Sequence, residues 1–217
     1  MKYAAAVFVL IVLACYGSPE SFAADGRNIS NVNGEVRATA GSTYDTISTV
    51  NGDVHLGQGV TAEEARTVNG EITVESEARV GTLKTVNGTL DIGEGVTVAR
   101  DASTVNGEVH LARRAQVGGD VSTVSGEIEI QGAEVTGNLS THNGDIELTD
   151  GARVRGGIHV KKNNNSDRGW GRDHPPRVSI CSTCVVEGEL RFDRPVELRV
   201  EQGAKIGAVI GEDVKRL

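Results

Sequence analysis

The chain has 217 residues, of which 28 are glycine and 38% are hydrophobic, while only seven are aromatic, and its net charge is −8. Glycine is about twice as frequent as in an average protein, and the aromatic rings that usually fill a globular core are scarce. The hydrophobic content exceeds that of disordered chains, and the acidic balance disfavours nucleic-acid binding. We therefore expect a folded protein with a slender interior.

Residues 1–23 have the pattern of a secretory signal peptide. Lys2 precedes the apolar stretch 4–14, and the small residues Ser21 and Ala23 allow cleavage after Ala23. The stretch is shorter than the roughly 20 residues of a membrane-spanning helix. As an alternative, residues 12–15 resemble the lipobox of bacterial lipoproteins, which makes Cys15 a candidate lipidated N-terminus. Both readings predict a periplasmic or secreted protein, and the second predicts an outer-membrane lipoprotein.

A Val-Asn-Gly repeat dominates residues 24–160. Its glycines, including two variant copies, recur every 18 or 19 residues, at positions 34, 52, 70, 88, 107, 126 and 144. Each is followed by apolar pairs at alternate positions, such as Val54 with Leu56 and Val60 with Ala62, and this alternation is typical of strands. Three short strands with corners fit one repeat. The period predicts an all-β, single-stranded parallel β-helix, a triangular β-solenoid of about nine turns, in which neighbouring turns bury each other's apolar faces.

The asparagines and glycines of the repeat are expected at corners of the solenoid. Asn-Gly tolerates the positive φ angles of tight turns, and stacked asparagines can hydrogen-bond along the column. The predicted structural asparagines are Asn33, Asn51, Asn69, Asn87, Asn106 and Asn143. We expect the valine of the tripeptide to face inward. His142, which replaces it in the last copy, is then expected to be a core histidine with a hydrogen-bond partner.

Residues 161–176 interrupt the repeat with a polar, proline-terminated loop, and solenoid turns resume over 177–217. The loop carries Trp170 with Arg168 and Arg172, a composition typical of binding hot spots. These three residues are candidates for contact with a partner or a glycan. The other interpretation is a loop whose tryptophan packs against the solenoid.

Cys181 and Cys184 form a Cys-Ser-Thr-Cys motif. Export places them in an oxidising compartment, which favours a disulfide across a turn, with Cys184 facing inward and Cys181 outward. Two free thiols remain open as an alternative, as does a redox or metal role.

The segments TVNGEITV, TVNGTLDIGEGVTV and TVNGEVHL resemble turns of bactofilins, the bacterial polymer-forming cytoskeletal proteins, and of related exported adhesin-type β-solenoids. The resemblance implies a right-handed triangular β-helix and, in bactofilins, polymerisation end to end through apolar terminal turns. The export signal and the inserted loop depart from bactofilins. Residues 92–97 also fit the hexapeptide rule of left-handed β-helices, but Val-Asn-Gly interrupts that pattern.

An acidic residue follows the repeat glycine in six of seven copies, at Glu35, Asp53, Glu71, Glu108, Glu127 and Asp145, with Thr89 in the remaining copy. Stacked turns bring such charges to about 4.8 Å, where each pair repels by roughly 1 kcal/mol in water. Three interpretations remain open: a solvated face, a stripe that binds Ca²⁺ or a cationic partner, and a catalytic cluster as in β-helical polysaccharide lyases and hydrolases. We find no cofactor motif, no Gly-x-Ser-x-Gly and no His-Glu-x-x-His.

These features favour a non-enzymatic exported scaffold of the bacterial cell envelope that associates with itself end to end. A second copy, an envelope protein or a glycan are the expected partners, and a membrane only through the lipid anchor. The alternative is a carbohydrate-active β-helix enzyme that uses the acidic residues.

Overall fold

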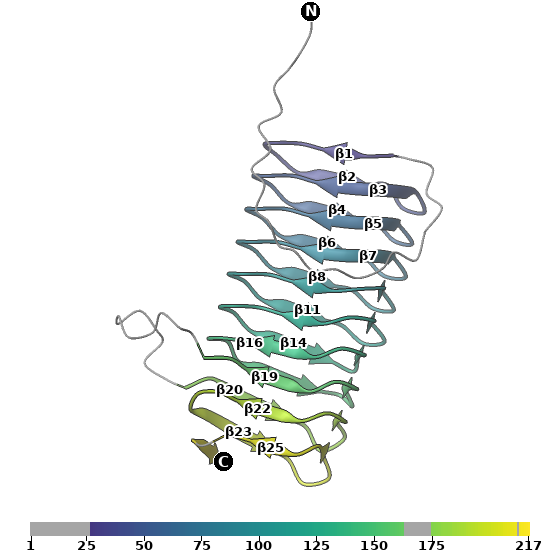
Figure 1. Cartoon of the computed structure of the whole chain (residues 1–217). Coiled ribbons are helices and arrows are strands. Elements are labelled where there is room, and N and C mark those ends of the chain that lie inside the picture. The colour runs from purple at the N-terminus through teal and green to yellow at the C-terminus, as the bar shows by residue number, and fades with distance from the viewer. Residues whose placement is uncertain (1–26, 163–174, 212) are drawn as a thin grey trace, which may run out of the picture.

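The computed structural model describes residues 27–162, 175–211 and 213–217. These residues contain only strands, turns and bends, and every strand pair is parallel. The strands stack into a rod of about ten turns, with the N-terminal turn at one end and the C-terminal turn at the other (Figure 1). The prediction of an all-β parallel solenoid is confirmed.

Each turn contributes strands to three sheet faces, which we call face 1, face 2 and face 3. Face 1 is a ten-stranded sheet of β2 (Val36–Ala38), β4 (Val54–Leu56), β6 (Ile72–Val74), β8 (Leu90–Ile92), β11 (Val109–Leu111), β14 (Ile128–Gln131), β17 (Ile146–Thr149), β20 (Arg177–Ile180), β23 (Val196–Val200) and β26 (Val214–Arg216). The solenoid has about ten turns, close to the nine or so expected from the sequence.

Faces 2 and 3 are joined near the N-terminus and separate further along the rod. Three longer strands bend across both faces: β3 (Thr43–Ser48), β5 (Thr61–Arg66) and β7 (Arg79–Lys84). Face 2 continues with β9 (Thr97–Val98), β12 (Gln116–Val117), β15 (Glu134–Val135), β18 (Arg153–Val154), β21 (Val185–Val186) and β24 (Lys205–Ile206). Face 3 comprises β1 (Ile29–Ser30), β10 (Ala102–Ser103), β13 (Val121–Ser122), β16 (Leu139–Thr141), β19 (Ile158–Val160), β22 (Leu190–Phe192) and β25 (Val209–Ile210).

Columns of small and medium apolar side chains form the core. Ile72, Leu90 and Val109 occupy one register position in successive turns and have no exposed surface. Burying a side chain of this size stabilises the fold by about 1.5–3 kcal/mol, and the narrow rod leaves room for few rings. Tyr44 and Phe192, near the two ends, are the buried aromatic residues of the described chain.

The repeat glycines are required by close approach of successive turns. A Cβ atom on Gly88 would collide with the carbonyl oxygen of Gly70, and the same holds along the column for Gly52, Gly70, Gly107, Gly126 and Gly144. We expected positive φ angles to explain these glycines. That explanation is incomplete, because Gly88 and Gly107 are not among the residues with positive φ.

The orientation expected for the tripeptide was wrong. The threonine before each valine is the buried residue, at Thr49, Thr67, Thr85, Thr104 and Thr123. Its methyl group fits the core, while its Oγ1 donates to the carbonyl of the repeat glycine one turn earlier, for example Thr104 to Gly88 at 3.0 Å. The valines lie at the corner instead, where Val32 is 62% and Val50 40% exposed.

His142 follows the valines to this corner. Its ring is half-buried and its Nδ1 is buried without a hydrogen-bond partner, contrary to the expected core histidine with a partner. Burial, followed by the positive charges of Lys161, His159 and Arg194, lowers the pKa of His142.

Candidate functional site

The predicted acidic residues form one outward column on face 1. We call this set, Glu35, Asp53, Glu71, Glu108, Glu127 and Asp145, the acidic column. Each member precedes the first core residue of its strand, and those core residues pair in register from Val36 to Ile146. The stacking expected from the sequence is thus confirmed for the described turns.

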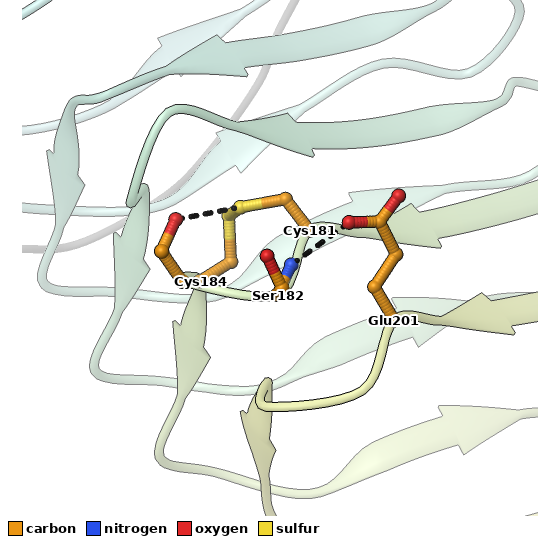
Figure 2. The surroundings of a disulfide bond; sticks show 5 residues. Cys181, Ser182, Cys184 and Glu201 are labelled. Carbon is orange, nitrogen blue, oxygen red and sulfur yellow. Dashed lines mark hydrogen bonds between the residues drawn. A yellow bond between two sulfur atoms is a disulfide. The ribbon is translucent and has the colours of Figure 1, made fainter.

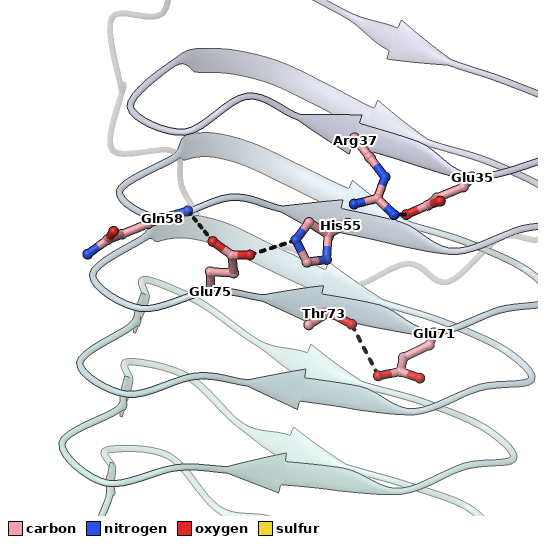
Figure 3. Close-up of polar contacts among 7 residues, drawn as sticks. All are labelled: Glu35, Arg37, His55, Gln58, Glu71, Thr73 and Glu75. Carbon is pink, nitrogen blue, oxygen red and sulfur yellow. Dashed lines mark hydrogen bonds and ion pairs between the residues drawn. The ribbon is translucent and has the colours of Figure 1, made fainter.

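Near the N-terminus the column carboxylates are held by their neighbours (Figure 3). Glu35 lies 2.6 Å from Arg37, Asp53 accepts the backbone N–H of Glu71 at 2.9 Å, and Glu71 accepts the hydroxyl of Thr73 at 3.1 Å. Each of these three carboxylates thus has an ion-pair or hydrogen-bond partner.

Beside the column, outward side chains form further pairs. His55 Nε2 lies 2.8 Å from Glu75, whose carboxylate also accepts the backbone N–H of Gln58 at 2.9 Å (Figure 3). His55 first, and then Gln58, lower the pKa of Glu75. His110 occupies the same outward position as His55 three turns later, between Asp91 at 3.2 Å and Glu129 at 3.8 Å. The two histidines serve separate ion pairs.

Negative charge concentrates around Glu127. Burial raises the pKa of this half-buried carboxyl group above its ordinary value of 4.5, and the neighbouring Asp145, Glu147, Glu108 and Glu129 raise it further. We call these five residues the acidic patch. In this patch the negative charge of the described acidic column is least compensated by neighbouring groups. The repeat pattern alone does not distinguish Glu127 from the other members of the column.

The column continues with alternating charge past the insertion, which sequence reasoning missed. The backbone N–H of Arg177 donates to Asp145 at 2.8 Å, and the next positions are Glu197 and Lys215. Glu197 lies 2.8 Å from Lys215 and 3.4 Å from Arg177, and both contacts lower its pKa, Lys215 more strongly. No repeat glycine marks these positions, so periodicity could not reveal them.

In the described part of the chain, no group of three His, Cys, Asp or Glu side chains could hold a metal ion. Binding of Ca²⁺ or a cationic partner by the acidic column stays a prediction.

Replacing Glu127 with glutamine should raise the free energy of unfolding at neutral pH, because it removes a half-buried charge beside four carboxylates. A pKa that is higher in the folded state makes the ionised group destabilising. The advantage of Glu127→Gln should therefore shrink as pH falls through the raised pKa and vanish below 4.5. Urea denaturation across this range measures it. Glu35→Gln, whose parent carboxylate pairs with Arg37, is the control, and an equal gain in both variants would contradict the prediction.

Two side-chain ladders hold the corners. Asn51, Asn69, Asn87 and Asn106 each donate from Nδ2 to the asparagine one turn earlier, at 2.8–3.1 Å, beginning with Asn33. These five asparagines are structural, as predicted.

The second ladder was not foreseen. It lies between faces 2 and 3, where Asp101 accepts the backbone N–H of Asp120, Asp120 that of Asn138, and Asn138 that of Gly157.

Asn143 has a different role from the other repeat asparagines. Its Oδ1 and the carbonyl of His142 accept hydrogen bonds from Arg194, a residue from beyond the insertion. Arg194 therefore connects the last repeat copy to the turns that follow the inserted loop.

Cys181 and Cys184 are joined by a disulfide, with Cα atoms 5.1 Å apart (Figure 2). Cys184 is fully buried, as the sequence predicted. Cys181, which was expected to face outward, is half-buried and packs against the core. The backbone N–H of Cys184 also donates to the Cys181 carbonyl at 3.0 Å, and that of Ser182 donates to Glu201 at 3.1 Å. The disulfide thus closes a tight turn. Cys184 occupies the inward position that Ala152 holds one solenoid turn earlier.

The remaining predicted sites lie outside the described residues. They are Cys15 and the signal peptide, and Arg168, Trp170 and Arg172 of the inserted loop. No helix of the described ranges is long and apolar enough to cross a membrane.

Comparisons of the chain with protein-family models, with curated proteins and with solved structures found no match.

Proposed function

We propose that the chain is an exported, non-enzymatic scaffold of the bacterial cell envelope whose rod associates with itself end to end. The observation that carries this proposal is the open strand edge at each end of face 1. Among the described residues β2 pairs only with β4, and β26 only with β23. Unpaired backbone groups of an edge strand are a template for another chain, and stacked repeats can extend wherever an end is not capped.

Other features support a structural role. The asparagine ladder and the second ladder of Asp101, Asp120 and Asn138 use polar groups to hold successive turns together. The disulfide closes a corner within one turn. Disulfides persist in oxidising compartments, in agreement with the expected signal peptide. The resemblance of the repeat to bactofilins and to exported adhesin-type β-solenoids points in the same direction.

The test is the assembly state of the protein after export and processing. Size-exclusion chromatography with light scattering should give a mass above that of one chain that increases with concentration, and negative-stain microscopy should show rods longer than one solenoid. A single-chain mass over the whole accessible concentration range would refute self-association.

A carbohydrate-active enzyme is the second candidate, and the acidic patch is the observation that favours it. Glycoside hydrolases need a carboxyl group with a raised pKa near a second carboxylate, and Glu127 has such an environment. Incubation with acidic and neutral polysaccharides, followed by reducing-end and unsaturated-product assays, tests it. Turnover that Glu127→Gln abolishes would support the enzyme, and absence of turnover by the unaltered protein would count against it.

A further inference from the structure

Two surfaces on the sides of the rod carry opposite charges that their described neighbours leave largely unpaired. The first is the acidic patch on face 1. Its strands β11, β14 and β17 pair in register, so that Glu129 and Glu147 are direct neighbours one turn apart. Glu108, Glu127 and Glu147 form no ion pair with another described residue, and Glu129 has only the 3.8 Å contact with His110. The patch therefore gathers five carboxylates on three consecutive turns.

The second surface lies on face 3 and at the corner that leads from it to face 1. We call this surface the basic cluster, and it consists of His142, His159, Lys161, Arg191 and Arg194. Lys161 Nζ contacts the hydroxyl of Ser140 at 3.5 Å, and Arg194 donates to the carbonyl of His142 at 2.7 Å. Neither Lys161 nor Arg194 has a carboxylate partner within the described ranges, because these contacts are with neutral oxygen atoms. Both positive charges thus remain unpaired there.

His159 and Arg191 are the members of the basic cluster on face 3 itself. They share one carboxylate, that of Asp193, at 2.6 and 3.1 Å respectively. In register they continue a column of outward residues that includes Ser122 and Ser140. Because serine side chains are short, the sheet beside the cluster is flat, and another surface can approach it closely.

We propose that the basic cluster of one copy binds the acidic patch of a second copy, so that rods associate side by side. Each surface extends over three turns, about 10 Å along the rod, so their lengths match as well as their charges. No ion pair of the described residues joins the two surfaces within one rod. Single exposed pairs contribute little to stability, but complementary patches attract and orient two proteins.

The contact joins two different surfaces, so it is heterologous and does not close on a pair of copies. Each added copy presents another acidic patch or basic cluster to the next one. The contact is independent of the proposed end-to-end association, because it lies on the sides of the rod and not at its ends. Side-by-side association increases the width of an assembly, whereas end-to-end association increases its length, and the two are measured separately.

The experiment reverses the charge of each surface in turn. The acidic-patch variant carries Glu108→Lys and Glu147→Lys, at two exposed positions. The basic-cluster variant carries Lys161→Glu and Arg191→Glu, and it keeps Arg194, whose hydrogen bonds connect the turns on either side of the insertion. In each variant like charges would face each other at the contact, which should weaken side-by-side association by roughly a hundredfold.

The matched control reverses two positive charges elsewhere on the rod. It carries Arg79→Glu and Lys205→Glu, at exposed outward positions of β7 and β24 on face 2. The control and the basic-cluster variant have the same net charge, so a difference between them reports the place of the charges and not their number.

Negative-stain microscopy and sedimentation velocity of the processed full-length proteins give the width and mass of the assemblies. They are compared at about 0.01 M and about 1 M salt, between which the Debye length falls from roughly 30 Å to 3 Å. The unaltered protein and the control should form assemblies wider than one rod at low salt and separate at high salt. Each surface variant should stay one rod wide at both. An equimolar mixture of the two surface variants should recover the width, because the intact cluster of one meets the intact patch of the other. Both variants remain net negative, so general attraction does not explain recovery.

Circular dichroism and the melting temperature show whether each variant folds, and Lys161→Glu alone replaces the basic-cluster variant if that one does not. Width that survives either reversal in a folded protein, or a mixture that stays narrow, would overturn the proposal. So would an unaltered protein that remains one rod wide at low salt, even if it binds dextran sulfate or Ca²⁺, because the partner is then not a second copy. Rods that lengthen without widening would leave end-to-end association intact, and wide assemblies of single-rod length would refute that association alone.

Discussion

Gly88→Ala should prevent stable folding or lower the free energy of unfolding by about 3 kcal/mol or more. The added Cβ atom would meet the carbonyl oxygen and carbon of Gly70, and both are main-chain atoms that hydrogen-bonded strands hold on either side. The turns would have to separate locally, which breaks the register on which the glycine column and the asparagine ladder depend. Chemical denaturation followed by far-ultraviolet circular dichroism measures the loss.

Gly59→Ala is the matched control for this substitution. Gly59 has a φ angle of 65° but open space where its Cβ atom would lie. Its replacement should cost about 1 kcal/mol for the left-handed conformation. A loss at Gly88 no larger than that at Gly59 would show that close approach of the turns does not explain the repeat glycines.

Leu111→Ala should destabilise the protein by about 2–5 kcal/mol, the range for removing a buried leucine side chain. Leu111 has no exposed surface and is stacked in register between Ile92 and Ile130. The cavity therefore weakens the contacts of one turn with both of its neighbours, and in a stacked repeat those contacts carry the stability.

His110→Ala tests the same strand on its other side. His110 faces outward and pairs with Asp91 at 3.2 Å, so its removal should change the free energy of unfolding by no more than about 0.5 kcal/mol. Equal losses at residues 110 and 111 would contradict the assignment of inward and outward sides on β11.

The architecture was predictable because a period of 18 or 19 residues leaves few folds that bury the apolar pairs. The tripeptide could not be oriented in the same way. Thr104 and Val105 are both β-branched and similar in size, and only the position of the Gly88 carbonyl in the preceding turn selects the threonine for the interior. The partner of that hydrogen bond is distant in sequence, and no local pattern contains it.

The change of period has a similar origin. Val80 and Leu83 are separated by two residues, whereas Val98 and Ala102 are separated by three, with Asp101 as the added corner residue. Asp101 begins the second ladder by accepting the N–H of Asp120. The sequence shows the extra residue, but the hydrogen bond that it accepts from the next turn is apparent only in the stacked structure.

The acidic column was foreseen as a stack, whereas the differences among its members were not. Glu35 is neutralised by a neighbour on its own strand, while Glu127 lies among carboxylates from the turns on either side. The environment of Glu127 depends on its burial and on which outward residues lie beside it on the neighbouring strands. The role of Arg194 could not be predicted either, because its hydrogen bond to the carbonyl of His142 joins residues on opposite sides of the inserted loop.

The bonds of the glycine column and of the asparagine ladder join each turn only to the turns directly before and after it. The length of this rod is therefore a property that a gene can change by duplicating or deleting one repeat, such as residues 53–70, without creating a new kind of contact. Each such step would move the ends by about 4.8 Å. A change of one residue within a strand would instead turn core side chains outward, so viable length variants of this protein should differ by whole turns or at corners.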